Sequence, residues 1–171
     1  ERLKGELARF DIVGKDQVEM VGSLIGYEGE IAILSATTEA PDQNKWSVGM
    51  NETLKSDPKY AKMKLVATVY GDDRPEKPST EMEAMLSNFP NLKGVIAPTT
   101  VGIAAAAQVV QSRGIADKVN VTGLGLPSEM KDFVKDKTVT AVKLGSPYHE
   151  RWRAVHFAAG RLGGPQQKQI V

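Results

Sequence analysis

An apolar strand that runs without a linker into an alanine-rich helix is the feature that most constrains this chain. The apolar residues 95–97 are followed by a Pro-Thr-Thr turn, and residues 101–107 continue as a helical pattern rich in alanine. Such a turn brings the free N–H groups of the first helical turn to the carboxyl end of the strand. Open α/β sheets bind ligands along this edge. The segment therefore predicts an α/β fold with a binding site near residues 98–100.

Short β-rich segments alternate with helical patterns through the middle of the chain. Strands are expected at residues 31–34, 65–70, 94–97, 119–123 and 139–144. Between them, apolar residues recur at spacings of three and four, as in amphipathic helices. This alternation is typical of a parallel sheet with helices on both faces. We expect a three-layer α/β/α sandwich whose doubly wound, mostly parallel sheet has five or six strands, Rossmann-like or flavodoxin-like in outline.

The two ends of the chain fit this pattern less clearly. Residues 1–9 predict a short amphipathic helix, residues 10–13 a brief strand, and the residues up to Ile25 another helix. Near the other end, Trp152, Val155, Ala159 and Leu162 share one helical face and predict a last helix. We expect one α/β domain over residues 1–171.

Composition excludes several classes of function. The chain has 171 residues, of which 41% are hydrophobic and 25% charged, and its net charge is +1 with both signs evenly mixed. Nucleic acid and membrane surfaces are therefore poor candidates for a partner. No apolar run approaches the roughly 20 residues that a membrane span needs. The absence of cysteine excludes disulfides, thiol nucleophiles and cysteine-ligated metals.

The loops that follow the expected strands are rich in hydroxyls, amides and carboxylates. This group comprises Ser35, Asp42, Gln43, Asn44, Asp72, Asp73, Thr99, Thr100 and Ser146. Such groups suit an uncharged, polyhydroxylated ligand, because sugar hydroxyls donate and accept hydrogen bonds at once. The same residue types also cap helices and form turns, which is an equally open interpretation for each of them taken alone.

Motifs for catalysis are incomplete in this chain. His149-Glu150 resembles the start of a zinc-protease helix, but Arg153 stands where the second histidine is needed. The pair Gly123 and Gly125 is only a fragment of a dinucleotide fingerprint, and Gly-x-Ser-x-Gly is absent. We therefore expect no catalytic residue, no metal and no cofactor.

A phosphate-accepting receiver domain is a further hypothesis. Asp72 and Asp73 follow an expected strand, as the acidic pocket of such a domain would, and Lys143 could supply its lysine. The next strand, however, ends in Pro98 and Thr99, where this hypothesis needs the aspartate acceptor.

Four segments of the chain resemble a known family. GYEGEIAILSATTEAPDQNKW, KLVATVYGDD, LKGVIAPTTVGIAAAAQ and VNVTGLGLPSEMKDFVKDKTV resemble the carboxyl-terminal lobe of periplasmic sugar-binding proteins of ABC transporters. Within that family, the rhamnose and autoinducer-sugar binding proteins of the ribose-binding type are the most similar. The resemblance spans residues 27–144, and the DQNKW and PTTVGIAAAA segments carry most of it.

The resemblance implies a function and a set of site residues. In that family, two Rossmann-like lobes close on a sugar in the periplasm, and the closed form is presented to a membrane permease. Asp42 and Gln43 match the acidic and amide pair that hydrogen-bonds sugar hydroxyls. Pro98 and Thr100 match strand-end positions that make backbone contacts with the ligand.

The chain also departs from the family pattern. Family members are roughly twice as long, and the amino-terminal lobe has no counterpart here. Residues 1–22 and 148–171 do not resemble the family's hinge-crossing segments. These features suggest a single lobe in an engineered or chimeric chain; a natural protein with divergent ends is the alternative. We expect weak sugar binding or none, and an exposed hinge surface or sheet edge through which two copies could pair.

Overall fold

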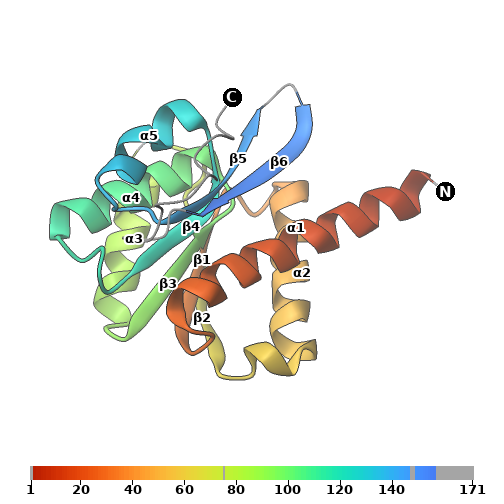
Figure 1. Cartoon of the computed structure of the whole chain (residues 1–171), viewed down its shortest axis with the longest axis horizontal. Helices are drawn as coiled ribbons and strands as arrows, with labels where there is room; N and C mark the ends of the chain where they lie inside the picture. Colours follow the sequence, from red (N-terminus) through yellow and green to blue (C-terminus); the bar gives the residue numbers. More distant parts are fainter. Residues whose placement is uncertain (1, 75, 147–148, 157–171) are drawn as a thin grey trace, which may run out of the picture.

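One sheet runs through the molecule, with strand order β2-β1-β3-β4-β5-β6 (Figure 1). The computed structural model describes the backbone of residues 2–74, 76–146 and 149–156, and the side chains of residues 12–74 and 76–143. The strands are β1 (Gly29–Ser35), β2 (Met63–Tyr70), β3 (Leu92–Ala97), β4 (Asn120–Gly125), β5 (Ala141–Ser146) and β6 (His149–His156). The first five pair in parallel, and β6 pairs antiparallel with β5. The predicted doubly wound, mostly parallel sheet is thus confirmed.

Helices cover both faces of the sheet (Figure 1). On one face lie α1 (Arg2–Ile25) and α2 (Pro41–Ser56), with the short 3-10 helix η1 (Pro58–Tyr60) after α2. On the other face lie α3 (Lys77–Asn88), α4 (Thr100–Arg113) and α5 (Pro127–Lys135). The predicted three-layer α/β/α sandwich is confirmed.

The core consists of two apolar layers, one on each face of the sheet. Ile31 and Ile33 of β1 pack with Ile96 of β3 against α1 and α2, whereas Ala32 and Leu34 of β1 point to the α3–α5 side. Alternate residues of a strand point to opposite faces, so a strand covered on both faces must be apolar throughout. This explains why residues 31–34 form an uninterrupted apolar run.

The amino-terminal end differs from the prediction. Arg2–Ile25 is one continuous helix, so the strand expected at residues 10–13 is wrong. Within this helix, Gly14 lies so close to α2 that a Cβ atom there would be 3.0 Å from the backbone N of Met50 and from the O of Trp46. The helix must continue through this point to pack on α2, and this tertiary packing overrides the weak local pattern.

The carboxyl-terminal end also differs. The helix expected to begin near Trp152 is wrong for residues 149–156, which form β6. An unpaired β5 would leave a row of backbone N–H and C=O groups at the sheet edge, and pairing with β6 satisfies them. The rest of that predicted helix, with Ala159 and Leu162, lies outside the described residues.

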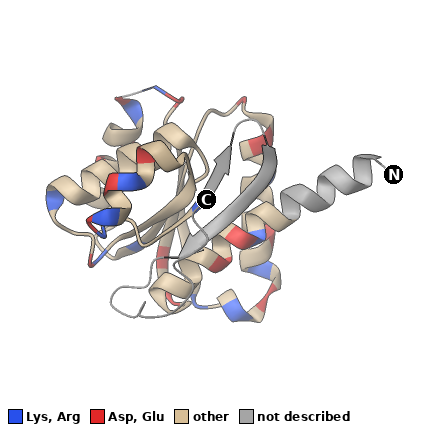
Figure 2. Ribbon diagram, turned by 45° about the horizontal axis from the view of Figure 1, so that its top comes forward, with Lys and Arg blue, Asp and Glu red and all other residues tan. Residues whose placement is uncertain are grey.

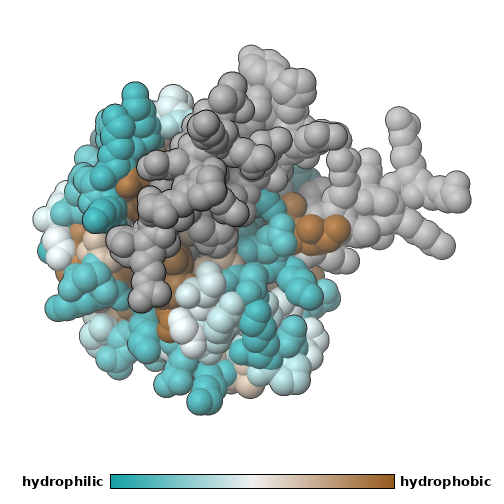
Figure 3. All heavy atoms as spheres, in the orientation of Figure 1, coloured by the Kyte–Doolittle hydropathy of each residue, from teal (hydrophilic) through white to brown (hydrophobic). Residues whose placement is uncertain are grey.

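The described surface is polar and mixed in charge. Acidic and basic residues are interspersed over the helices (Figure 2). On the face drawn in Figure 3, hydrophilic residues cover most of the described surface. Among the residues that the structure describes, no helix combines the length and the apolar composition of a membrane span.

Candidate functional site

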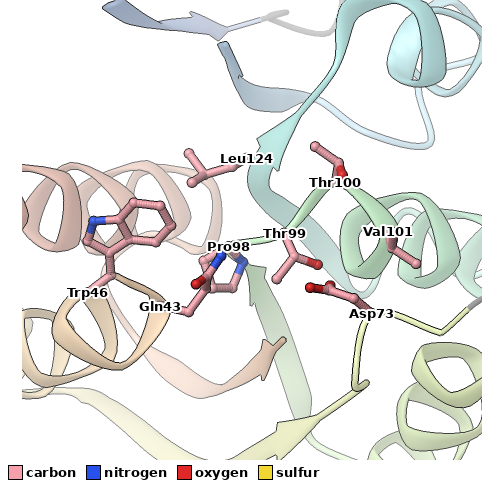
Figure 4. Close-up of a pocket in the computed structure, with 8 residues that line it drawn as sticks. All are labelled: Gln43, Trp46, Asp73, Pro98, Thr99, Thr100, Val101 and Leu124. Carbon is pink, nitrogen blue, oxygen red and sulfur yellow. The ribbon is translucent and has the colours of Figure 1, made fainter. Parts of the chain in front are cut away.

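A cavity of about 280 Å³ opens at the carboxyl edge of the sheet (Figure 4). Its walls are formed by Gln43, Trp46, Asp73, Pro98, Thr99, Thr100, Val101 and Leu124. These residues come from α2, the turn after β2, the connection from β3 into α4, and β4. Four segments that are far apart in sequence thus meet at one place.

The position of the cavity follows from the topology. β1 lies between β2 and β3 in the sheet. The chain therefore passes from β1 to β2 on one side of β1, and later crosses to β3 on the other side of β1. The connections after β1 and β3 therefore lie on opposite faces, as α2 and α4 do, and a crevice forms between them. Ligands of doubly wound sheets bind in such crevices.

The α2 wall consists of Gln43 and Trp46 (Figure 4). They are three residues apart, so they share one face of the helix. Both side chains are half-buried, and Trp46 also packs against the core layer between the sheet and α1–α2. This wall combines an amide, which can donate and accept hydrogen bonds, with an apolar ring.

The strand-end wall is formed where β3 runs into α4. The Thr99 hydroxyl accepts a hydrogen bond from the backbone N–H of Gly102 at 2.8 Å, so Thr99 is the N-cap of α4. Thr100 is the first residue of the helix, and its side chain is half-buried. The predicted strand-to-helix turn therefore forms, and it places two threonines at the cavity.

Asp73, in the turn after β2, lines the cavity beside the strand-end wall (Figure 4). Asp72 and Asp73 have φ angles of 53° and 48°, in the left-handed region. The Asp72 carboxylate pairs with Lys77 Nζ at 2.5 Å, whereas Asp73 lines the cavity. The two adjacent carboxylates are thus used differently.

Three of the four residues proposed from the sequence lie together. Gln43, Pro98 and Thr100 line the cavity, while Asp42 is exposed in the first turn of α2 and does not line it. Trp46 also lines the cavity but was not predicted from the sequence as a site residue. The sequence did hold a signal for it, because Trp46 is three residues from Gln43 and therefore lies on the same face of the helix.

The receiver hypothesis gains no support from the positions of its residues. Lys143 Nζ bonds to Asp16 Oδ2 at 2.6 Å, and Asp72 pairs with Lys77. Over the described residues, no three histidine, aspartate or glutamate side chains gather in a group that could hold a metal.

Comparison with known proteins gives the ancestry of this fold. The periplasmic binding protein domain family matches residues 8–166. A sugar ABC transporter protein from Actinomyces odontolyticus is 43% identical, with a TM-score of 0.78 over 81% of this chain. An ABC transporter solute-binding protein from Clostridium phytofermentas, solved with bound L-rhamnose, is 38% identical with a TM-score of 0.77, also over 81%. One from Burkholderia graminis, in complex with D-arabinose, is 28% identical with a TM-score of 0.69 over 78%.

These relatives are longer than this chain. The match covers 44% of the Actinomyces and Clostridium chains and 46% of the Burkholderia chain. The match thus spans less than half the length of these three relatives, and this chain corresponds to a single lobe. The extent of the family match and the two identities above 30% place it in one family: this chain belongs to the periplasmic binding protein domain family.

Proposed function

We propose that this chain forms one wall of a sugar-binding cleft and binds its ligand without catalysis. The observation that carries the proposal is the cavity at the strand-order reversal, where an amide, two hydroxyls, a carboxylate and an indole converge. Two relatives were solved with bound sugars, L-rhamnose in one and D-arabinose in the other, and this supports the ligand class.

The contacts we propose combine polar and apolar groups. Gln43 and Thr100 hydrogen-bond to sugar hydroxyls, with exposed Asp42 as an outer contact, and Pro98 contributes its backbone carbonyl. A sugar hydroxyl both donates and accepts, which an amide and a hydroxyl can each match. Trp46 offers an apolar surface to the C–H face of the ring.

We propose that the single lobe binds weakly. A ligand in this cavity is covered on one side only, while association still costs several kcal/mol of lost freedom. We therefore expect a Kd of about 1 mM or weaker. In a complete protein, a second lobe would close on the sugar, and the closed form would engage an ABC permease in the periplasm.

The test is an NMR titration of the uniformly labelled chain with L-rhamnose and D-arabinose. At sugar concentrations up to about 50 mM, we expect saturable shifts of the amides of Gln43, Trp46, Thr100 and Leu124. Gln43→Ala should weaken binding. Its matched control is Gln108→Ala, which removes an exposed amide on α4 about 12 Å along the helix from Thr100. This variant should leave binding unchanged.

The contrary results define the alternative. A chain that keeps its dispersed spectrum but shows no saturable shift with either sugar would be a folded scaffold without binding activity, as expected of an engineered or chimeric lobe. If Gln43→Ala and Gln108→Ala weakened sugar binding equally, the cavity would not be the binding site. Sedimentation at the NMR concentration tests separately whether two copies of the chain pair.

A further inference from the structure

We infer that the ion pair between Lys77 and Asp72 positions the Asp73 carboxylate at the wall of the cavity. Lys77 does not line the cavity, and it acts only through its ion pair with Asp72, the residue before Asp73 in the turn. The inference rests on the proposed sugar site for its functional consequence. Its structural part can be tested without any sugar.

The backbone of this turn is unfavourable by itself. Asp72 and Asp73 are consecutive residues other than glycine with φ angles of 53° and 48°. A left-handed conformation is unfavourable for an L-residue other than glycine, although aspartate tolerates it better than most. Two such residues in a row persist only where the surrounding structure determines them.

Backbone contacts fix the beginning of the turn. The N–H of Gly71 donates to the carbonyl of Ser35 at 2.9 Å, and the N–H of Asp72 donates to that of Ala36 at 2.7 Å. Gly71 also packs against Pro78 of α3, because a Cβ atom on it would lie 2.7 Å from the proline Cγ. The turn therefore starts from a fixed point between β1 and α3.

Beyond this point the turn is held by the N–H of Arg74, which donates to the carbonyl of Gly71 at 3.2 Å, and by the side chain of Asp72. Its carboxylate lies 2.5 Å from Nζ of Lys77, the first residue of α3. This contact holds Asp72 toward α3, while the next residue, Asp73, lines the cavity beside the β3–α4 connection (Figure 4). The ammonium also offsets the charge of Asp72, so the two adjacent carboxylates repel each other less.

The experiment compares Lys77→Met with the unchanged chain and with Lys77→Arg, which retains the pair. Backbone couplings and chemical shifts of Asp72 and Asp73 report the left-handed conformation. We expect Lys77→Met to move both residues away from left-handed values and Lys77→Arg to preserve them. Unchanged couplings in Lys77→Met would overturn the inference. If Lys77→Met does not fold, Asp72→Asn, which breaks the same ion pair, is used in its place.

Sugar titration then tests the consequence. Because the Asp73 carboxylate lines the cavity, we take it as a further sugar contact. We expect Lys77→Met to weaken L-rhamnose binding about three- to ten-fold, and to have no further effect when Asp73→Ala is already present. Additive losses in the double variant would contradict an action through Asp73.

Glu83→Gln is the matched control. This variant breaks the ion pair between Glu83, whose side chain is 43% exposed, and Arg113, whose side chain is 41% exposed. The exposure is similar in the pair under test, at 38% for Asp72 and 41% for Lys77. Glu83→Gln should leave sugar affinity unchanged. If the unchanged chain binds no sugar, the proposed function fails, and the NMR couplings still decide whether Lys77 holds the turn.

Discussion

Lys143 on β5 bonds through Nζ to Oδ2 of Asp16 on α1 at 2.6 Å, across 127 positions of sequence. The Lys143 side chain is 6% exposed, whereas that of Asp16 is 49% exposed. A buried ammonium needs a partner, and this one ties the amino-terminal helix to the last parallel strand. In the sheet register, Lys143 lies opposite Leu124, which lines the cavity.

Removing only the carboxylate should therefore destabilise the fold. We expect Asp16→Asn to lower the free energy of unfolding by about 1–3 kcal/mol, because the buried Lys143 ammonium is left uncompensated. Adding Lys143→Met should recover most of this loss, since no buried charge then remains. Urea unfolding of the single and double variants measures both effects. A double variant no more stable than Asp16→Asn would show that burial of the charge is not the cause.

A second polar cluster lies where the end of α1 meets η1. The Glu19 carboxylate accepts hydrogen bonds from the hydroxyls of Tyr27 at 2.6 Å and Tyr60 at 2.5 Å, and from Lys59 at 2.8 Å. Burial raises the pKa of Glu19, but the bonds from Lys59, Tyr27 and Tyr60 outweigh it and lower the pKa to about 2. Burial and the bond to Glu19 raise the pKa of Tyr60.

The shift predicts acid sensitivity. An unfolded glutamate titrates near 4.5, so the contribution of Glu19 is complete above that pH and is lost as pH falls toward about 2. Its side chain is 41% exposed, and solvent screening limits the loss to about 1 kcal/mol. Urea midpoints between pH 7 and pH 2.5 should fall less steeply for Glu19→Gln, which starts lower at pH 7. Parallel curves for the two proteins would contradict this assignment.

The layers of the fold could be predicted because burial leaves a local pattern. The run at residues 31–34 is apolar throughout since β1 is covered on both faces, and it lies within the observed Gly29–Ser35. The last strand leaves no such pattern. β6 is an edge strand whose formation depends on the unpaired backbone of β5, so helical spacing around Trp152 was misleading.

The candidate site could be predicted only in part. The DQNKW motif offered Asp42 and Gln43 equally, but only Gln43 lines the cavity, and a matching motif does not decide between them. The position of Asp73 depends on two left-handed residues and on bonds to the end of β1. Neither condition is visible in the sequence around Asp73.

Gly123 lies where β4 approaches β3, and replacing it with any other residue should destabilise the fold. Its φ is 148°, and a Cβ atom there would lie 1.9 Å from the backbone O of Ala97. We expect Gly123→Ala to cost more than about 3 kcal/mol, because backbone must move at the edge that carries the cavity. Gly114 is the matched control: it has a φ of 64° but open space around its Cβ position. Gly114→Ala should cost only about 1–2 kcal/mol. Similar urea midpoints for the two variants would refute this contrast.

The two threonines of the strand-to-helix turn should separate stability from binding. The Thr99 hydroxyl caps α4 through Gly102, so Thr99→Ala should lower the free energy of unfolding by about 1 kcal/mol, while Thr99→Ser retains the cap. Thr100 lies inside the first helical turn and lines the cavity, so Thr100→Ala should leave the urea midpoint nearly unchanged and weaken sugar binding. If Thr100→Ala instead lowers stability as much as Thr99→Ala and spares binding, the hydroxyl at position 100 belongs to the fold and not to the site.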